Sequence, residues 1–178
     1  MPSIKIFDGA KIIGEENIKF GKYIIIDDFV FIYAKESIKI NDYVHIASFT
    51  SISGGGKVIL EEFVSIASGC RLITGSDDFK NGGFGNPTID NSFRNNEIGS
   101  IIIEKFSIIG ANSIIFPNVT IGEGASIGAG SIVTRNIKPW AIYFQNKIIG
   151  YRNKEEVLKN YQRFLETSEN ERIGSLFK

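Results

Sequence analysis

Large aliphatic residues recur at every sixth position between Ile103 and Lys138. The lead positions of six consecutive hexads are held by Ile103, Ile109, Ile115, Ile121, Ile127 and Val133. An α-helix would scatter residues with this spacing around its whole circumference, and a strand alone repeats every two residues. The period of six therefore predicts a repeat architecture, in which each unit buries its apolar residue by stacking on the next.

The fourth position of each hexad predicts a tight corner in the backbone. This position is occupied by Phe106, Asn112, Asn118, Gly124, Gly130 and Asn136. Glycine and asparagine tolerate positive φ better than most residues. A short strand, a corner and another short strand form one wall of a parallel β-solenoid, so we expect an all-β fold of this type.

The same period extends towards the N-terminus in groups of three. The lead residues are Phe20, Ile26 and Ile32, then Ile40, Ile46 and Ile52, and then Leu60, Ile66 and Leu72. The step is six within a group and eight between groups. Three hexads therefore make one turn of a triangular prism, with two additional residues at one corner. We expect the solenoid to cover residues 20–138, after an irregular cap that contains Ile6 and Ile13 and spans residues 1–19.

The period is interrupted between Thr74 and Ser100. This stretch is rich in glycine, asparagine, serine and aspartate, and it contains Pro87. The hexads resume in full after it, so we expect a loop that leaves one corner of the prism and returns. Long loops inside compact domains are usually functional or disordered, which makes residues 74–100 the first place to look for an active site.

The solenoid is expected to stop at Pro139-Trp140, before a strand-like run. Asn153 and Glu156 stand at capping-box spacing, which predicts a helix from about Lys154 to Glu166. Apolar residues lie on one face of this helix, so we expect it to cover the open last turn. The polar tail after Ser168 is expected to be frayed. We treat residues 1–178 as a single domain.

Composition excludes several classes of protein. The chain has 178 residues with 20 basic and 20 acidic side chains, so it lacks the charge of a nucleic-acid-binding protein. The single Cys70 cannot form an internal disulfide, and the N-terminus does not resemble a secretory leader. No apolar run approaches the roughly 20 residues that a membrane helix needs. We therefore expect a cytoplasmic protein that does not insert into membranes.

The hexads at residues 109–114 and 119–134, together with the stop at Pro139-Trp140, resemble the hexapeptide-repeat acyltransferases. The resemblance covers about residues 20–150. It implies a left-handed parallel β-helix, a homotrimer, and acetyl-CoA as the acyl donor, with no metal. The left hand comes from the resemblance alone, because right-handed crossovers are the general default.

Within that family, the aspartate-rich loop and Asn86-Pro87-Thr88 resemble the sugar acetyltransferases of surface-polysaccharide assembly, including lipopolysaccharide biosynthesis. This resemblance implies acetyl transfer to a hydroxyl or amino group of a sugar or nucleotide-linked sugar. Two departures stand out. Galactoside-type members have a catalytic His-Pro pair in the loop, where this chain has Ser76-Asp77-Asp78-Phe79. The usual Gly-Asn-Pro-Ala is replaced by Phe144-Gln145-Asn146-Lys147.

Three side chains are candidates for the catalytic site. His45 is the only histidine and, as the sixth residue of its hexad, should point outward one turn below Ser65. Histidine is the usual general base because its pKa is about 6.5. Asp77 and Asp78 are the rivals: they could orient His45 or hold the acceptor. Adjacent aspartates in a glycine-rich loop also commonly form turns. An amine acceptor could need no strong protein base, so these alternatives stay open.

The resemblance also places CoA on the outer face of the C-terminal turns. The matching small residues are Gly110, Ala111, Gly128 and Ala129, which allow close approach of a ligand to the backbone. Arg135 and Lys138 could bind the phosphates and Trp140 could stack on the adenine. Tight stacking of the turns would also explain the small residues.

Corner positions in the N-terminal turns carry a stripe of aromatic residues. These are Tyr23, Phe29, Tyr43, Phe49 and Phe63. An exposed apolar stripe would be unfavourable on a monomer, so we expect at least part of it to form a subunit interface. The alternative is that the loop or a terminus covers it. Cys70 falls on an inward position and is expected to be a small core residue.

Other functions of such a fold are less consistent with the residues. A β-solenoid carbonic anhydrase would need three histidine ligands, and the chain has one. An ice-binding wall would need a column of threonines, which Thr50, Thr120 and Thr134 do not form. A catalytically inactive trimer that serves as a structural or binding module remains the alternative to an enzyme.

Overall fold

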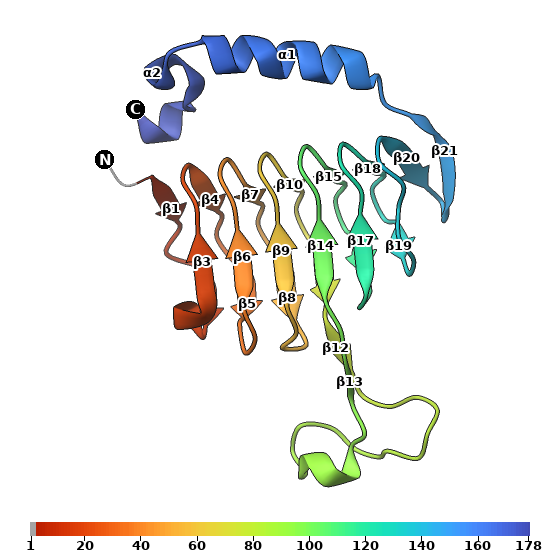
Figure 1. Cartoon of the computed structure of the whole chain (residues 1–178). Helices are drawn as coiled ribbons and strands as arrows, with labels where there is room; N and C mark the ends of the chain where they lie inside the picture. The colour runs from red at the N-terminus through yellow and green to blue at the C-terminus, as the bar shows by residue number, and fades with distance from the viewer. Residues whose placement is uncertain (1–2) are drawn as a thin grey trace.

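The computed structural model describes residues 3–178, which wind into a triangular prism with three walls of short strands (Figure 1). Sheet A consists of β1 (Ile4–Ile6), β4 (Ile24–Ile26), β7 (His45–Ile46), β10 (Ser65–Ile66), β15 (Ile108–Ile109), β18 (Ser126–Ile127), β20 (Ala141–Phe144) and β21 (Lys147–Tyr151). Sheet B consists of β2 (Lys11–Ile13), β5 (Phe31–Tyr33), β8 (Ser51–Ser53), β11 (Arg71–Ile73), β16 (Ile114–Ile115) and β19 (Ile132–Val133). Sheet C consists of β3 (Ile18–Phe20), β6 (Ile38–Ile40), β9 (Val58–Leu60), β14 (Ile101–Ile103) and β17 (Val119–Ile121). We name the corners C/A, A/B and B/C after the sheets they join.

The predicted hexad register is confirmed by the strand pairing. In sheet C, Ile40 pairs with Leu60, Leu60 with Ile103, and Ile103 with Ile121, all in parallel. These residues are fully buried and belong to one continuous core that runs along the prism. Cys70 lies in the same core, as expected, and burial raises the pKa of its thiol.

The opening turn is more regular than the sequence suggested. After β1 and β2 a short 3-10 helix, η1 (Glu15–Asn17), leads into β3. β1 and β2 extend sheets A and B, with Ile6 opposite Ile26 and Ile12 opposite Ile32. Ile6 remains 37% exposed although it is in register, because no turn precedes it to cover its other side. The expected irregular cap is therefore wrong: residues 4–13 continue the solenoid, and Ile12 takes the place assigned to Ile13.

Positive φ at the corners is confirmed for five of the six C-terminal positions, the exception being Asn136. The side chain of Asn136 instead accepts a hydrogen bond from the Thr120 backbone N–H at 2.8 Å. The aromatic residues adopt the same conformation, with φ near 60°. They divide between two corners. The C/A corner holds Tyr23, Tyr43, Phe63, Phe106 and Trp140, one above the other, and the A/B corner holds Phe29 and Phe49.

The C/A corner is covered by helix α1 (Lys154–Glu166), which runs along the length of the prism (Figure 1). Its start agrees with the prediction, because the Asn153 side chain accepts a hydrogen bond from the Glu156 backbone N–H. The ring of Phe164 packs edge-on against Tyr43 and Phe63, with centroids 5.2 Å from each. The expectation that this helix covers the last turn is therefore wrong. That end carries the antiparallel hairpin of β20 and β21 instead.

The tail after Ser168 is ordered, contrary to expectation. It forms α2 (Glu169–Arg172) and the 3-10 helix η3 (Ser175–Phe177). Phe177 is buried against the ring of Tyr23, and the Tyr23 hydroxyl donates to the Glu169 carboxylate. The apolar side chain and this hydrogen bond attach the tail to the first full turn. None of the helices in residues 3–178 is long and apolar enough for a membrane span.

Raising the pH should loosen this attachment. The hydrogen bond to Glu169 raises the pKa of Tyr23 from about 10 to about 12. The folded chain thus holds this proton more tightly than the unfolded chain, and its stabilising effect is complete below pH 10 and lost as the pH rises towards 12. Tyrosinate absorbance during alkaline titration should show one phase near the upper value. A Glu169→Gln variant should move the midpoint of that phase to lower pH. An unchanged titration would contradict the hydrogen bond to Glu169 as the cause of the raised pKa.

Candidate functional site

The interrupted stretch forms a loop at the B/C corner, as predicted, on the side of the prism opposite α1 (Figure 1). Its stem is an antiparallel pair of β12 (Gly75–Ser76) and β13 (Glu97–Ile98), and its tip carries the 3-10 helix η2 (Asn91–Phe93). The buried Thr74 hydroxyl donates to the Ser53 carbonyl at 2.7 Å, which fixes the stem to the turn below. The loop therefore projects from the prism on a stem that is fixed by hydrogen bonds.

The two loop aspartates have different surroundings. The Asp78 carboxylate accepts hydrogen bonds from the backbone N–H groups of Lys80, Asn81 and Gly83 and from the Asn95 side chain. These donors hold the pKa of Asp78 far below its usual range. A carboxylate saturated in this way shapes the loop and is a poor proton acceptor.

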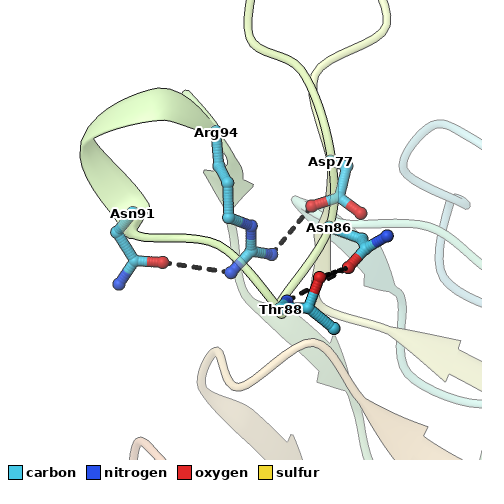
Figure 2. A network of polar contacts seen from close by, with 5 residues as sticks. All are labelled: Asp77, Asn86, Thr88, Asn91 and Arg94. Atoms are coloured by element: carbon cyan, nitrogen blue, oxygen red, sulfur yellow. Dashed lines mark hydrogen bonds and ion pairs between the residues drawn. The ribbon is translucent and has the colours of Figure 1, made fainter.

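Asp77 is paired with Arg94 (Figure 2). The guanidinium donates through Nη2 to Asp77 Oδ1 at 2.7 Å and through Nη1 to Asn91 Oδ1 at 3.0 Å. Arg94 is largely buried, with 13% of its side chain exposed, whereas 39% of the Asp77 side chain is exposed. Arg94 thus holds Asp77 in place and leaves part of its carboxylate accessible.

A second contact orders the neighbouring part of the loop. The Asn86 side-chain oxygen accepts hydrogen bonds from both the backbone N–H and the hydroxyl of Thr88, at 3.0 and 2.8 Å (Figure 2). Asn86 and Thr88 flank Pro87, which lines a cavity of about 330 Å³ beside the loop. The Asn-Pro-Thr sequence therefore shapes one side of this cavity.

His45 lies on the outer face of sheet A, as predicted, and pairs with Ser65 of the next turn. Its Nε2 is 3.1 Å from Oδ2 of Asp27, and both side chains are partly exposed, at 42% and 29%. With the proton on Nε2, Asp27 accepts it and Nδ1 retains the lone pair that a general base needs. Asp27 was not identified from the sequence.

The structure does not bring His45 and the loop aspartates together within one chain. His45 is on sheet A, and Asp77 and Asp78 are in the loop at the B/C corner. The contacts described for residues 3–178 join His45 to Asp27 and Asp77 to Arg94. The aspartate that orients His45 in this chain is therefore Asp27, in place of the expected loop carboxylate.

The small residues assigned to CoA lie where sheet A meets the A/B corner, on turns nearer the C-terminus than His45. Gly110 and Gly128 follow β15 and β18 directly, and Ala111 and Ala129 come next at the A/B corner. A side chain at Gly110 would meet the backbone of Ala129 at 2.5 Å. Stacking of the turns therefore already requires this glycine. The exposed Ala129 leaves room for a ligand along the corner.

The other three residues assigned to CoA are dispersed. Trp140 is 7% exposed and lies at the C/A corner, with its ring against Gly124 and close to Phe106. Arg135 is exposed and donates to the Asn146 carbonyl at 3.2 Å. Lys138 is exposed in the segment that leads to Trp140. The packing of Trp140 leaves little of its ring for an adenine, and its binding role stays a prediction.

Comparison with known proteins agrees with this geometry. The family described as "Bacterial transferase hexapeptide (six repeats)" matches residues 100–135. The chain is 36% identical over 141 residues to dTDP-4-amino-4,6-dideoxy-D-glucose acyltransferase of Escherichia coli. The aligned region covers 79% of this chain and 73% of that protein. A single-residue variant of AntD, an N-acyltransferase from Bacillus cereus in complex with dTDP and coenzyme A, superposes with a TM-score of 0.87 at 34% identity. That match covers 93% of this chain and 89% of AntD.

The chain therefore belongs to the hexapeptide-repeat acyltransferases, and its fold is a parallel β-solenoid. It is also 47% identical over 55 residues to dTDP-3-amino-3,6-dideoxy-alpha-D-galactopyranose 3-N-acetyltransferase of Aneurinibacillus thermoaerophilus. That second match covers 30% of this chain and 29% of the relative.

In residues 3–178 no three His, Cys, Asp or Glu side chains are grouped as a metal site would require.

Proposed function

We propose that this protein transfers an acetyl group from acetyl-CoA to a nucleotide-linked sugar, and that the acceptor group is an amine. The observation that carries the proposal is the match to AntD in complex with dTDP and coenzyme A along 93% of the chain. The relative from Escherichia coli is likewise named for a dTDP-linked amino sugar. A place in cell-surface polysaccharide biosynthesis, in the cytoplasm where activated sugars and acetyl-CoA are available, follows from this substrate class.

The chain supplies proton transfer and positioning. Acetyl-CoA, when bound, supplies a thioester whose carbonyl carbon is attacked by the acceptor nitrogen. Nδ1 of His45 accepts the proton that this nitrogen loses, and Asp27 holds the ring through Nε2–H and stabilises the resulting imidazolium. The carbon–sulfur bond of the thioester then breaks, and the imidazolium returns its proton to the departing CoA thiolate. Asp77, kept in place by Arg94, accepts a hydrogen bond from the acceptor and orients it.

We propose a homotrimer as the working form. Phe29 and Phe49 stack at the A/B corner with centroids 5.0 Å apart and remain 62% and 59% exposed. Sheet B presents further exposed apolar side chains, including Phe31, Ile132 and Phe116. Exposed surface of this kind is expected to be covered by another subunit. Packing sheet B of one copy towards sheet A of the next would bring the loop of the first copy towards His45 of the second.

Turnover of acetyl-CoA tests the function directly. Release of free thiol should be measured with a panel of nucleotide-linked sugars that includes dTDP-linked 3-amino and 4-amino sugars and their hydroxyl counterparts. We expect turnover with an amino sugar and none with its hydroxyl counterpart. Absence of turnover with every sugar, together with no detectable binding of CoA, would reject the enzyme and leave a binding or structural trimer.

The position of CoA is tested by placing a negative charge on its proposed path. An Ala129→Glu variant should raise KM for acetyl-CoA by about tenfold or more, because the new carboxylate repels the CoA phosphates and fills the open corner. Ala129 is exposed, so the fold should tolerate the change. Asn160→Glu, an exposed position on α1 away from sheets A and B, is the matched control and should leave this KM unchanged. Equal KM values for both variants would place CoA elsewhere.

A further inference from the structure

The cavity beside the loop is built by two parts of the chain that are distant in sequence. Tyr33, at the end of β5, and Lys35 come from the prism, whereas Asp77, Arg94 and Asn96 come from the loop. The floor contains Gly54 and Gly75, whose backbones are so close that a side chain at Gly54 would meet the Gly75 nitrogen at 2.1 Å. The cavity is therefore a consequence of how the loop is seated on the turn below.

The size of the cavity limits what it can hold. Ligand sites usually range from about 300 to 1,000 Å³, and this cavity of about 330 Å³ lies at the lower end. A complete nucleotide-linked sugar, with its base, ribose, two phosphates and hexose, needs more space. The cavity therefore accommodates one end of such a molecule.

The charge of the lining indicates which end. Lys35 and Arg94 contribute two positive charges and Asp77 one negative charge, and the other lining residues are neutral, which leaves a net charge of plus one. Arg94 is fixed by Asp77 and Asn91, so its position does not depend on a ligand. A net positive lining favours phosphate over an amine. The ring of Tyr33 adds a flat apolar surface of the kind on which nucleobases stack.

We propose that this cavity binds the nucleoside-diphosphate end of the acceptor, with Lys35 and Arg94 towards the phosphates and Tyr33 against the base. The proposal rests on the function proposed above and assigns residues to one part of its substrate. The amino end of the sugar then lies at the mouth of the cavity beside the partly exposed Asp77 and faces the neighbouring copy's acyl-transfer site. Lys35 becomes a determinant of affinity for the nucleotide, with no part in the chemistry.

Binding of dTDP to the full-length protein tests the proposal without any turnover. Lys35→Ala should raise the Kd for dTDP, measured by titration calorimetry, by about tenfold, because a charged hydrogen bond or ion pair to phosphate is lost. Lys35 is exposed, so the variant should fold. Lys39→Ala, which removes an exposed lysine from the outer face of sheet C, is the matched control and should bind like the wild type.

A second probe separates the base from the phosphates. Thymidine, which has no phosphate, should lose affinity in Tyr33→Leu and keep it in Lys35→Ala. Unchanged dTDP affinity in Lys35→Ala, or no binding of dTDP to the wild type, overturns the proposal. If turnover is normal and Lys35→Ala retains the wild-type KM for the nucleotide sugar, the site assignment fails and the function stands. If dTDP binds through Lys35 and no sugar is acetylated, the proposed acetyltransferase function is rejected and the assignment of the cavity to a nucleoside diphosphate is kept.

Discussion

Replacing His45 by alanine is expected to lower kcat for acetyl transfer by about 10²- to 10⁴-fold, the usual contribution of a positioned general base. The loss follows from the geometry: His45 is exposed on sheet A, and its Nε2 is held by Asp27 at 3.1 Å, which leaves Nδ1 free to accept a proton. KM for acetyl-CoA should change little, because the residues assigned to CoA lie on other turns. Initial rates with the preferred sugar, over a range of both substrates, separate the two parameters.

Asp27→Asn provides the graded comparison. The asparagine can still accept a hydrogen bond from Nε2–H but carries no charge to stabilise an imidazolium, so we expect a loss of kcat smaller than that of His45→Ala. The double variant should be no slower than His45→Ala alone, since Asp27 acts through His45. A His45→Ala enzyme with nearly normal kcat would reject the histidine as base. It would indicate that the neutral amine attacks without one, positioned by the Asp77–Arg94 pair.

Replacing Phe164 by alanine is expected to lower the free energy of unfolding by about 2–4 kcal/mol. This ring makes edge-on contacts with Tyr43 and Phe63 and lies 5.3 Å from the Arg172 guanidinium. Loss of a large, partly buried aromatic side chain and of its ring contacts gives a change of this size. Denaturant unfolding followed by circular dichroism measures it.

Leu165→Ala is the matched control, because Leu165 is the next residue of the same helix and is 43% exposed. Its replacement should change the free energy of unfolding by less than about 1 kcal/mol, since alanine favours the helix and little packing is lost. Equal effects of the two substitutions would mean that the aromatic corner does not hold α1. The ring of Phe63 would then be stabilised by its stacking on Tyr43, at 4.8 Å, and on Phe106, at 5.5 Å.

The prism could be predicted because its signal is local and repeated. Each hexad places one aliphatic residue in the core, so Ile103 and Ile121 could be aligned from the sequence. The path of α1 could not be predicted in this way. Its apolar face fits either the open end of the prism or the C/A corner, and the choice depends on the aromatic rings of several turns together. The division of these aromatics between two corners follows from the prism, since successive corners are six residues apart.

The candidate site was only partly predictable. The outward position of His45 followed from the hexads, but its partner Asp27 is 18 residues earlier, a contact between adjacent turns. The turn length could have indicated this partner. Ile26 pairs with Ile46, so one turn has 20 residues, and Asp27 therefore lies beside Ala47, two positions from His45. The pairing of Asp77 with Arg94 had no comparable signal, because it depends on the folding of an irregular loop.

The attachment of the C-terminal segment to the first turn has a consequence for how the molecule unfolds. In a solenoid each turn touches only its neighbours, so unfolding can begin at either open end and proceed turn by turn. Here one segment starts beside Trp140 at one end, where Lys154 lies over its ring, and finishes with Phe177 on Tyr23 at the other. Loss of the first turn therefore requires release of the C-terminal segment, which also packs along the C/A corner as far as Trp140. The C-terminal segment thus couples the two ends of the solenoid, so we expect the first and last turns to unfold together.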